Sequence, residues 1–472
     1  MKNYKILLLL CTAIITQSCF EDQDDNARDT TVQDFVWRGL NFWSLYKADV
    51  PDLANDRFGS FEERTIFLNK FDTPEDAFEA LTSERDRFSI IRDDYIILEN
   101  ALAGVRRSTG MRFSLKRNPQ NQSLVYGVVR YVIAGSPAAL AGVQRGDIFT
   151  AVNGITLDQN SDFDLIFSAE NFTIDLATYD GTTFTLTGES INLDNVELTI
   201  NPVHLAKTID IDGEKVGYLH YTGFTNEFDP ELNNAFAQFK SAGVSDLILD
   251  LRYNGGGSIE TANDLCTMIT GQFESQEFIT QQYNVDRNPE YEFVRRFNQN
   301  IGNDNDGERI NSLGLTRVFV LTSNSTASAS ELILSGLDPY IEVIQVGEST
   351  RGKFEGSFLL YDAPAPGFRR SEANSAHRYV MLPLVLKSIN ANGFTDYFDG
   401  ISPEEDLMYE EDFFNLGTLG DPSDPLLAMA INKIKNGRAS RPEPNPAHQS
   451  EKLFDIEETE PLFGKMYVEP QE

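Results

Sequence analysis

The sequence predicts a multidomain α+β protein, because three kinds of pattern follow one another along its 472 residues. Apolar residues first recur at helical spacing, short strands with glycines begin near Ser108, and strands alternate with helices from Lys215. A chain of this length can form two or three domains with substantial cores. Since 41% of its residues are hydrophobic, it has enough apolar surface to fold.

The charge balance narrows the range of partners. The formal net charge is −34 at pH 7. So acidic a chain is repelled by nucleic acid and by anionic membrane surfaces, and we expect neither to be its main partner.

The first residues indicate export. Lys2 and Lys5 precede an apolar run, residues 6–15, that is too short to span a membrane as a mature helix. This start resembles a bacterial lipoprotein signal, with cleavage of residues 1–18 and lipid on Cys19. Residues 19–28 then form an acidic tether that resembles the surface-export signal of Bacteroidetes lipoproteins. The resemblance implies an outer-membrane, surface-exposed protein anchored through Cys19. The alternative is a plain secretory signal in which Cys19 has no role.

Cysteine usage agrees with this location. Cys11 would leave with the signal and Cys19 would carry lipid, so Cys266 would remain alone. A disulfide framework and a cysteine metal site are therefore excluded. Cys266 lies on the apolar stripe of a predicted helix, and we expect a core thiol there.

Residues 29–105 predict a helical N-terminal domain. Val32, Val36, Leu40 and Trp43 share one face of a helix, and Thr73-Pro74-Glu75-Asp76 is typical of a helix start. The aromatic residues of this region are expected to be packing residues, and no chemistry is assigned to it.

Residues 106–200 predict a β-rich domain. Strands around residues 125–133 lead to a short capped helix, a glycine-bounded turn with Asp147, a strand and an Asn153-Gly154 turn. This order resembles a PDZ domain, a module that binds the C-terminal end of a partner chain as an added strand. The resemblance implies a carboxylate-binding loop at Gly110, Met111, Arg112 and Phe113. The alternative is a β-rich spacer.

Residues 201–434 predict an α/β core. Residues 216–221 form a strand, a helix follows with Asp229 as its cap, and the continuous apolar run of residues 246–251 indicates a buried strand. Residues 272–312 are polar and aromatic-rich, and we interpret them as a solvated loop. Residues 435–472, rich in proline and charge, are expected to be a polar surface extension.

The last part of this core contains the candidate chemistry. A buried strand at residues 318–321 is followed by a Ser/Thr/Asn cluster and by the first turns of a helix. This arrangement presents a serine hydroxyl at the positive end of a helix. A second strand, residues 343–346, leads to Lys353 in the loop or strand beyond it.

Three separate motifs, together with the preceding PDZ-like segment, resemble the S41 peptidases, also called C-terminal processing or tail-specific proteases. The motifs are residues 325–331 around Ser328, residues 347–353 ending in Lys353, and residues 250–257 with their three glycines. The resemblance covers roughly residues 100–405 and implies a crotonase-like α/β core. It implies endoproteolysis by a Ser-Lys dyad, with Ser328 as nucleophile and Lys353 as base. It also implies that the N–H groups of Gly256 and Ala329 stabilise the oxyanion.

The physical chemistry of the residues is compatible with these roles. A serine hydroxyl attacks an amide only when a base removes its proton, and a lysine can do so when burial keeps it neutral. Glycines let backbone N–H groups approach a developing oxyanion. The chain differs from the family pattern at two positions: Gly255 stands where proline is usual, and Ser357 stands where many members have the glutamine that orients the lysine. Glu331, one helical turn from Ser328, would support the site.

Other activities fit the sequence less well. Residues 347–353 also match a phosphate-binding loop, but Phe354 stands where Ser or Thr should hold magnesium. A Ser-His-Asp hydrolase would need His204, His220, His377 or His448, and none of them belongs to a motif. With 73 acidic residues in the chain, any proposed pair of carboxylates carries almost no information, so the sequence gives no support for glycosidase chemistry. The main alternative is a catalytically silent surface lipoprotein that binds C-terminal peptides. We expect a protein or peptide substrate with a free C-terminus, no nucleic acid, no metal and no organic cofactor.

Overall fold

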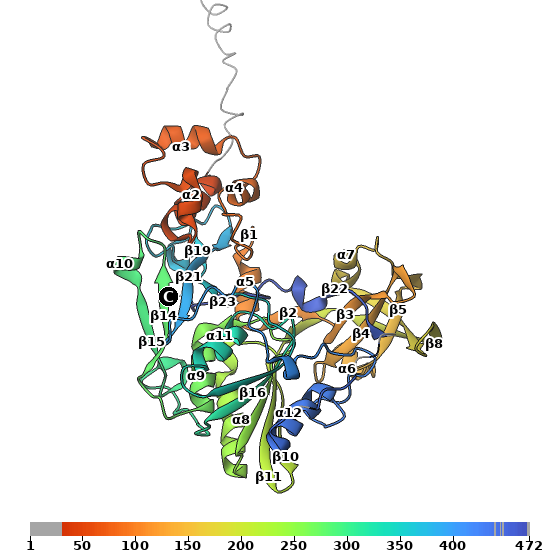
Figure 1. Cartoon of the computed structure of the whole chain (residues 1–472). Helices are drawn as coiled ribbons and strands as arrows, with labels where there is room; N and C mark the ends of the chain where they lie inside the picture. The colour runs from red at the N-terminus through yellow and green to blue at the C-terminus, as the bar shows by residue number, and fades with distance from the viewer. Residues whose placement is uncertain (1–30, 439, 444, 446–447, 470–472) are drawn as a thin grey trace, which may run out of the picture.

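The computed structural model describes residues 31–438, 440–443, 445 and 448–469, and Figure 1 shows their arrangement. The predicted signal, tether and lipidated Cys19 lie outside the described residues. In the described part no helix is long and apolar enough to cross a membrane. An N-terminal helical region, a β-rich domain and an α/β core make up the molecule (Figure 1).

The N-terminal region is helical, as predicted. Its helices are α2 (Thr31–Trp43), α3 (Phe61–Leu68), α4 (Pro74–Ala80) and α5 (Tyr95–Leu102), with 3-10 turns η2 (Lys47–Asp49) and η3 (Pro51–Leu53). The predicted helix start is confirmed, because Thr73 Oγ1 accepts from the N–H of Asp76 and the Asp76 carboxylate accepts from the N–H of Thr73. The apolar face of α2 packs into the main core of the protein. The short strand β1 (Ile90–Arg92) joins β20 (Val380–Leu382), which pairs with β19 (Leu360–Tyr361).

The β-rich domain has the element order expected of a PDZ domain. Its strands are β2 (Val105–Ser108), β3 (Met111–Asn118), β4 (Asn121–Val132), β5 (Ile148–Val152), β6 (Ile155–Thr156), β7 (Asn171–Tyr179), β8 (Phe184–Asp194) and β9 (Val196–Thr199). The helices α6 (Pro137–Leu140) and α7 (Phe163–Ser168) lie between strands of this order. Alternate side chains of β3, β4, β5 and β7 fill a separate core together with Phe167 of α7.

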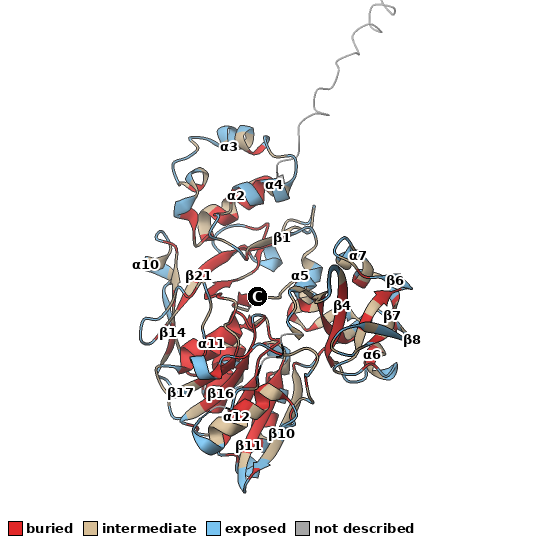
Figure 2. Cartoon of the chain, turned by 45° about the vertical axis from the view of Figure 1, so that its right-hand side comes forward, coloured by how far each residue is buried: buried red, intermediate tan, exposed pale blue. Residues whose placement is uncertain are grey.

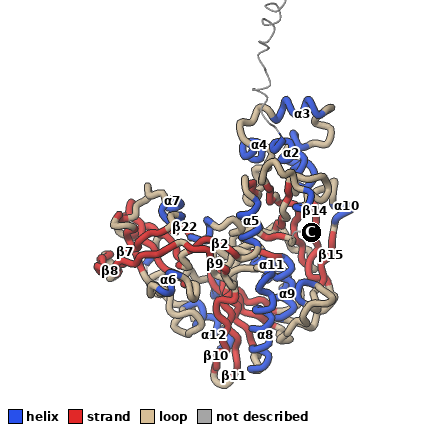
Figure 3. The backbone as a smooth tube through the Cα atoms, turned by 180° about the vertical axis from the view of Figure 1, so that it is seen from behind, coloured by secondary structure: helices blue, strands red, loops and turns tan. Residues whose placement is uncertain are grey.

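The α/β core is built on a mostly parallel sheet in the order β10-β11-β12-β16-β17. These strands are β10 (Val203–Ile211), β11 (Glu214–Tyr221), β12 (Asp246–Asp250), β16 (Arg317–Thr322) and β17 (Glu342–Gly347). One face packs on α8 (Asp229–Ala242), α9 (Ile259–Ile269) and α11 (Ala329–Leu337), seen side by side in Figure 3. The other face packs on α12 (Pro425–Asn436). The strands β12 and β16 are covered on both faces, and β16 is coloured red, or buried, in Figure 2; this burial explains their continuous apolar runs. Cys266 of α9 is buried, as expected.

A second sheet of the core runs in the order β13-β23-β18-β21-β14-β15. Its strands are β13 (Gly257–Ser258), β14 (Glu277–Tyr283), β15 (Phe293–Arg296), β18 (Glu355–Ser357), β21 (Leu384–Asn390) and β23 (Met466–Tyr467). Remaining short elements of the core are α10 (Asn288–Tyr291), η4 (Asn226–Phe228), η5 (Ile301–Asn303), η6 (Arg370–Glu372) and η7 (Glu405–Leu407).

This sheet corrects two interpretations made from the sequence. Residues 272–312 are not only a solvated loop, because β14 and β15 lie within them and the side chains of Phe278 and Ile279 are buried in the core. Residues 435–472 are not only a surface extension. They contain β22 (Lys452–Asp455), which joins the PDZ-like sheet, the turn η9 (Ile456–Thr459), and β23. Both regions have a polar average composition that conceals short apolar runs.

Candidate active site

Ser328 lies at the junction between the loop after β16 and helix α11. Its backbone has φ 67° and ψ −117°, a conformation that costs a non-glycine residue energy. The side chain is fully buried, and its Oγ has no hydrogen-bond partner among the described residues. A buried hydroxyl without a partner, on a strained turn at the start of a helix, is available for chemistry rather than for holding the fold.

The carboxylate of Glu331 joins the serine loop to the lysine loop. Its Oε2 accepts hydrogen bonds from the backbone N–H of Ser328 at 2.6 Å and of Lys353 at 2.8 Å. Its Oε1 accepts from the N–H of Gly352 at 2.7 Å and from Thr350 Oγ1 at 2.6 Å. Because two of these donors share one oxygen atom, the backbones of Ser328 and Lys353 are held close together. Burial raises the pKa of Glu331 to about 7, although the four donors favour its charged form.

We expect the substitution Thr350→Val to lower the free energy of unfolding by about 2–3 kcal/mol. The valine cannot donate to Glu331, and it also leaves unpaired the N–H of Ile401, which donates to Thr350 Oγ1 at 2.8 Å. Urea denaturation measures the change. The matched control is Ser349→Ala, next in sequence and hydrogen-bonded only to the exposed Ser402 hydroxyl, which should stay within about 0.5 kcal/mol of wild type. Equal stabilities of the two variants would contradict the role given to Glu331.

The Lys353 side chain is fully buried beside the site. Its Nζ donates to the carbonyl oxygen of Glu355 at 2.5 Å and lies 5.1 Å from the centre of the Phe88 ring. Burial lowers the pKa of Lys353 to about 8, a shift that the charges of Glu355 and Asp86 partly oppose. In this arrangement the Nζ is not hydrogen-bonded to Ser328 Oγ.

The N-terminal region, to which no chemistry was assigned from the sequence, packs against this site. Phe88 contacts the lysine, and Arg87 Nη2 donates to the carbonyl of Gly352 at 2.5 Å. Tyr46 donates to the Glu355 carboxylate at 2.5 Å. No sequence pattern could indicate this, because these residues are more than 260 positions from Lys353 along the chain.

Gly256 lies against both the predicted nucleophile and the predicted second oxyanion donor. A Cβ added at Gly256 would lie 2.6 Å from Ser328 Cβ and 3.0 Å from the backbone N of Ala329, and its φ of 108° also favours glycine. The Gly256 N–H donates to Asn254 Oδ1 at 2.9 Å. The two residues chosen as oxyanion donors are thus neighbours in space.

The two departures from the family pattern have structural counterparts. A Cβ at Gly255 would lie 2.5 Å from Cδ2 of Phe463 in the C-terminal segment, so this position has no room for a proline ring. Ser357 Oγ is buried and has no hydrogen-bond partner among the described residues. The Glu355 carbonyl, not Ser357, is the group that contacts the lysine Nζ.

A buried ionic cluster surrounds Arg252, just before the glycine loop. This cluster was not identified from the sequence. Arg252 is fully buried and forms ion pairs with Asp250, Asp424 and Glu411 at 2.6–2.7 Å. Arg145 of the PDZ-like domain reaches two of these acids, Glu411 and Asp424, at 3.2–3.4 Å. The acids at 411 and 424 are about 160–170 residues from Arg252, and only the fold brings them together.

The predicted carboxylate-binding loop begins strand β3. Met111 and Phe113 are buried in the PDZ-like core. Arg112 is also buried and forms an ion pair with Glu460 at 2.5 Å. The edge of β3 that the PDZ resemblance assigns to a peptide is paired with β22 of the same chain.

Comparisons with known proteins agree with this arrangement. The family models that match are Peptidase family S41 at residues 215–360, a PDZ domain at residues 128–172 and the Peptidase S41 N-terminal domain at residues 31–90. A carboxyl-terminal-processing protease of Synechocystis sp. is 28% identical over 341 residues, which cover 70% of this chain and 69% of that protein. One from Picosynechococcus sp. is 26% identical over 269 residues, covering 55% of this chain but only 58% of that protein. The crystal structure of an S41 protease from Bacteroides fragilis is similar with a TM-score of 0.67 at 26% identity, covering 85% of this chain and 97% of that one.

Proposed function

Because this chain belongs to peptidase family S41, we propose that it is a serine endopeptidase that uses Ser328 and Lys353 as a catalytic dyad. The observation that carries the proposal is the Glu331 carboxylate, which binds the backbones of both residues through one oxygen atom. The buried lysine with its lowered pKa and the partner-free serine hydroxyl supply the two chemical groups that the reaction needs.

In the proposed reaction Ser328 Oγ attacks the carbonyl carbon of the scissile amide while the neutral Lys353 amine removes its proton. The N–H groups of Ala329 and of Gly256, the latter once released from Asn254 Oδ1, stabilise the oxyanion. Lys353 then gives the proton to the leaving amine, the C–N bond breaks, and an acyl ester on Ser328 remains. Water, deprotonated by the same lysine, hydrolyses this ester. The Lys353 side chain must first turn from the Glu355 carbonyl toward Ser328.

We propose that substrates are proteins or peptides recognised through a C-terminal region, with a free carboxylate near Gly110–Phe113. Strand β3 pairs with β22 on the side where an extended peptide would add, so a substrate would take its backbone hydrogen-bonding groups by displacing β22. We further propose that the protein is exported and anchored through a lipid on Cys19.

The test compares one unstructured polypeptide with a free and with an amidated C-terminus. Wild type should cleave both, and amidation should raise KM about tenfold at little change in kcat, because it removes a charge that contributes to binding only. Mass spectrometry of the products identifies the cleaved bonds. Equal KM values would contradict C-terminal recognition. Binding of both peptides without cleavage would instead favour a catalytically silent peptide-binding protein, a reading consistent with the absence of a hydrogen bond between Ser328 Oγ and Lys353 Nζ.

A further inference from the structure

The C-terminal segment, residues 452–468, first crosses the peptide-binding edge of the PDZ-like domain. Strand β22 pairs antiparallel with β3, and Phe454 lies opposite Leu115 in the register. Leu453, Phe454 and Ile456 pack against the PDZ-like core, with the Phe454 ring 6.1 Å from that of Phe163 in α7. The segment therefore lies along β3 with its apolar side chains toward α7, as an added strand of a peptide ligand does.

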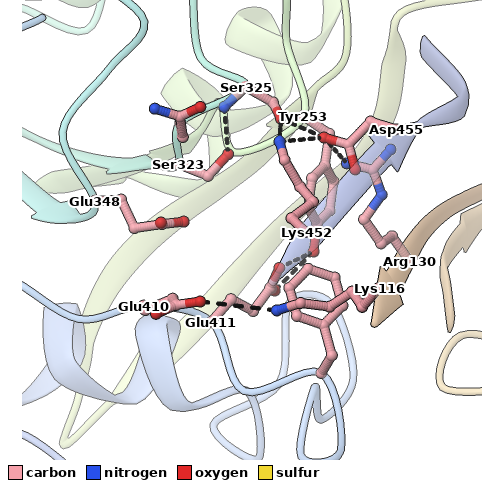
Figure 4. A pocket seen from close by; sticks show the side chains of 12 residues that line it. Lys116, Arg130, Tyr253, Ser323, Ser325, Glu348, Glu410, Glu411, Lys452 and Asp455 are labelled. Atoms are coloured by element: carbon pink, nitrogen blue, oxygen red, sulfur yellow. Dashed lines mark hydrogen bonds and ion pairs between the residues drawn. The ribbon is translucent and has the colours of Figure 1, made fainter. Parts of the chain in front are cut away.

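Asp455, at the end of β22, ties this strand to the serine loop. Its carboxylate accepts from Ser325 Oγ at 2.6 Å and from Lys452 Nζ at 2.8 Å, and it also bonds to the Ser114 hydroxyl of β3. Figure 4 shows Lys452 and Asp455 beside Ser325. They line a cavity of about 320 Å³ between the PDZ-like domain and the α/β core. Although burial alone would raise it, the charges of Arg130 and Lys452 hold the pKa of Asp455 well below its usual range.

The same segment then enters the candidate active site. Strand β23 pairs in parallel with Gly257 and Ser258 on one side and with Ser357 on the other. The Val468 N–H donates to the Ser357 carbonyl at 2.9 Å. The segment thus fills the space between the strand that leaves the oxyanion loop and the strand that follows Lys353.

Residues just before β23 contact neighbours of the two catalytic residues. Phe463 lies against Gly255, and Arg351 stacks over its ring at 4.8 Å. Lys465 Nζ lies 5.6 Å from the centre of the Phe88 ring, the ring that Lys353 also contacts. With this segment in place, Ser328 and Lys353 are fully buried, so a polypeptide substrate cannot reach them.

We propose that residues 452–468 are an intramolecular ligand that occupies both the peptide groove along β3 and the cleft beside Ser328. A substrate replaces this segment with an extended stretch of the same chemical class, rich in aromatic and aliphatic side chains. The inference rests on the proposed function and extends it to a substrate class. Leu453 and Phe454 mark the side chains preferred in the groove, and Phe463, Met466 and Tyr467 those preferred in the cleft.

Two features favour displacement of the segment, against the ion pairs of Glu460 with Arg112 and of Glu457 with Arg130 that hold it. Its strands are short, four residues in β22 and two in β23. The segment also buries the amine of Lys465. Burial first and the charge of the nearby Lys353 second lower the pKa of Lys465 to about 7, so its charged form is unfavourable there. Segments that pair with their neighbours over only a few residues and that bury a charge open more readily than continuous core strands.

The first test measures cleavage of an unstructured polypeptide by full-length wild type, Phe454→Ala and Glu451→Gln. Phe454→Ala weakens the packing of the segment on the PDZ-like domain and leaves the groove itself unchanged. More of the enzyme is then open to substrate, so KM should fall about tenfold while kcat stays unchanged. Glu451, the exposed residue just before the segment, makes only a surface ion pair with its side chain, and its backbone hydrogen bond is kept in Glu451→Gln, which should behave as wild type. An unchanged or raised KM for Phe454→Ala, with wild-type cleavage intact, would overturn the inference and leave the proposed function standing.

The second test does not depend on catalysis. Hydrogen exchange is followed in full-length Ser328→Ala with and without an excess of a synthetic peptide that has the sequence of residues 450–468. The peptide should compete with the chain's own segment, so amides 453–455 and 466–468 should lose protection while those of β11 and β12 keep it. Unchanged protection at saturating peptide would overturn the inference even if the enzyme is active.

Discussion

Replacing Ser328 by alanine should lower kcat for an unstructured polypeptide by about four orders of magnitude. The alanine has no atom that can attack the amide, and only the oxyanion donors and substrate binding remain to favour the reaction. Stability should change little, because the serine Oγ makes no hydrogen bond among the described residues and the backbone N–H still donates to Glu331. Product release measured by mass spectrometry gives kcat, and thermal unfolding checks the fold.

The neighbouring serines supply the control. Ser330 is buried two residues away and donates to the Asn254 carbonyl at 3.0 Å, so Ser330→Ala should cost about 1 kcal/mol of stability while kcat stays within threefold. If Ser330→Ala abolished cleavage and Ser328→Ala did not, the nucleophile would have been assigned to the wrong serine of the cluster.

The sequence predicts those parts of the fold that long local patterns encode. The continuous apolar runs at residues 246–251 and 318–321 correspond to β12 and β16. The capping residues before α4 and the apolar stripe containing Cys266 in α9 also match the structure. In each case several consecutive residues carry the same physical signal, and tertiary packing agrees with it.

The parts that were missed depend on contacts between distant segments. Strand β23 has two residues and β22 has four, so neither produces a recognisable period, and each is stabilised by pairing with strands more than 100 residues away. The position of β14 is likewise fixed by its pairing with β21. Short strands of this kind have no signal apart from their partners.

The candidate site shows the same division. Motifs indicate Ser328, Lys353 and Gly256, since each stands in a local pattern of a turn or helix start. Spacing alone places Glu331 one turn from Ser328, but not the hydrogen bonds from Gly352 and Lys353 that give this carboxylate its structural meaning.

The unusual glycine at position 255 becomes informative only with the structure. In the sequence it is a mild departure from the family pattern. In the fold, a Cβ at this position would collide with the Phe463 ring and approach the backbone N of Gly464 to 3.0 Å. The glycine therefore fits the C-terminal segment into the cleft, which agrees with a segment that belongs there when substrate is absent.

Replacing Lys353 by methionine should lower kcat by about three to four orders of magnitude, because the methionine cannot accept the serine proton. The double variant with Ser328→Ala should be no slower than Ser328→Ala alone, since the two residues act as one unit. The pKa of Lys353 is lowered from 10.5 to about 8 in the folded chain. Below pH 8 the lysine is protonated in both states, and its burial then lowers the free energy of unfolding by about 3 kcal/mol. This loss of stability diminishes as the pH rises from 8 toward 10.5. Lys353→Met should therefore unfold at pH 7 no more easily than wild type, whereas a purely structural lysine would lose stability when replaced.

The pH dependence of wild-type kcat/KM provides the second readout for Lys353. The base must be neutral, and with a pKa of about 8 its neutral fraction falls tenfold for each pH unit below that value. The rate should therefore rise with pH and level off above about pH 8. Lys353→Arg keeps a side chain that stays charged at these pH values, so it should be inactive throughout. A flat profile between pH 6 and 9 with an active wild type would contradict a lysine base whose pKa is about 8.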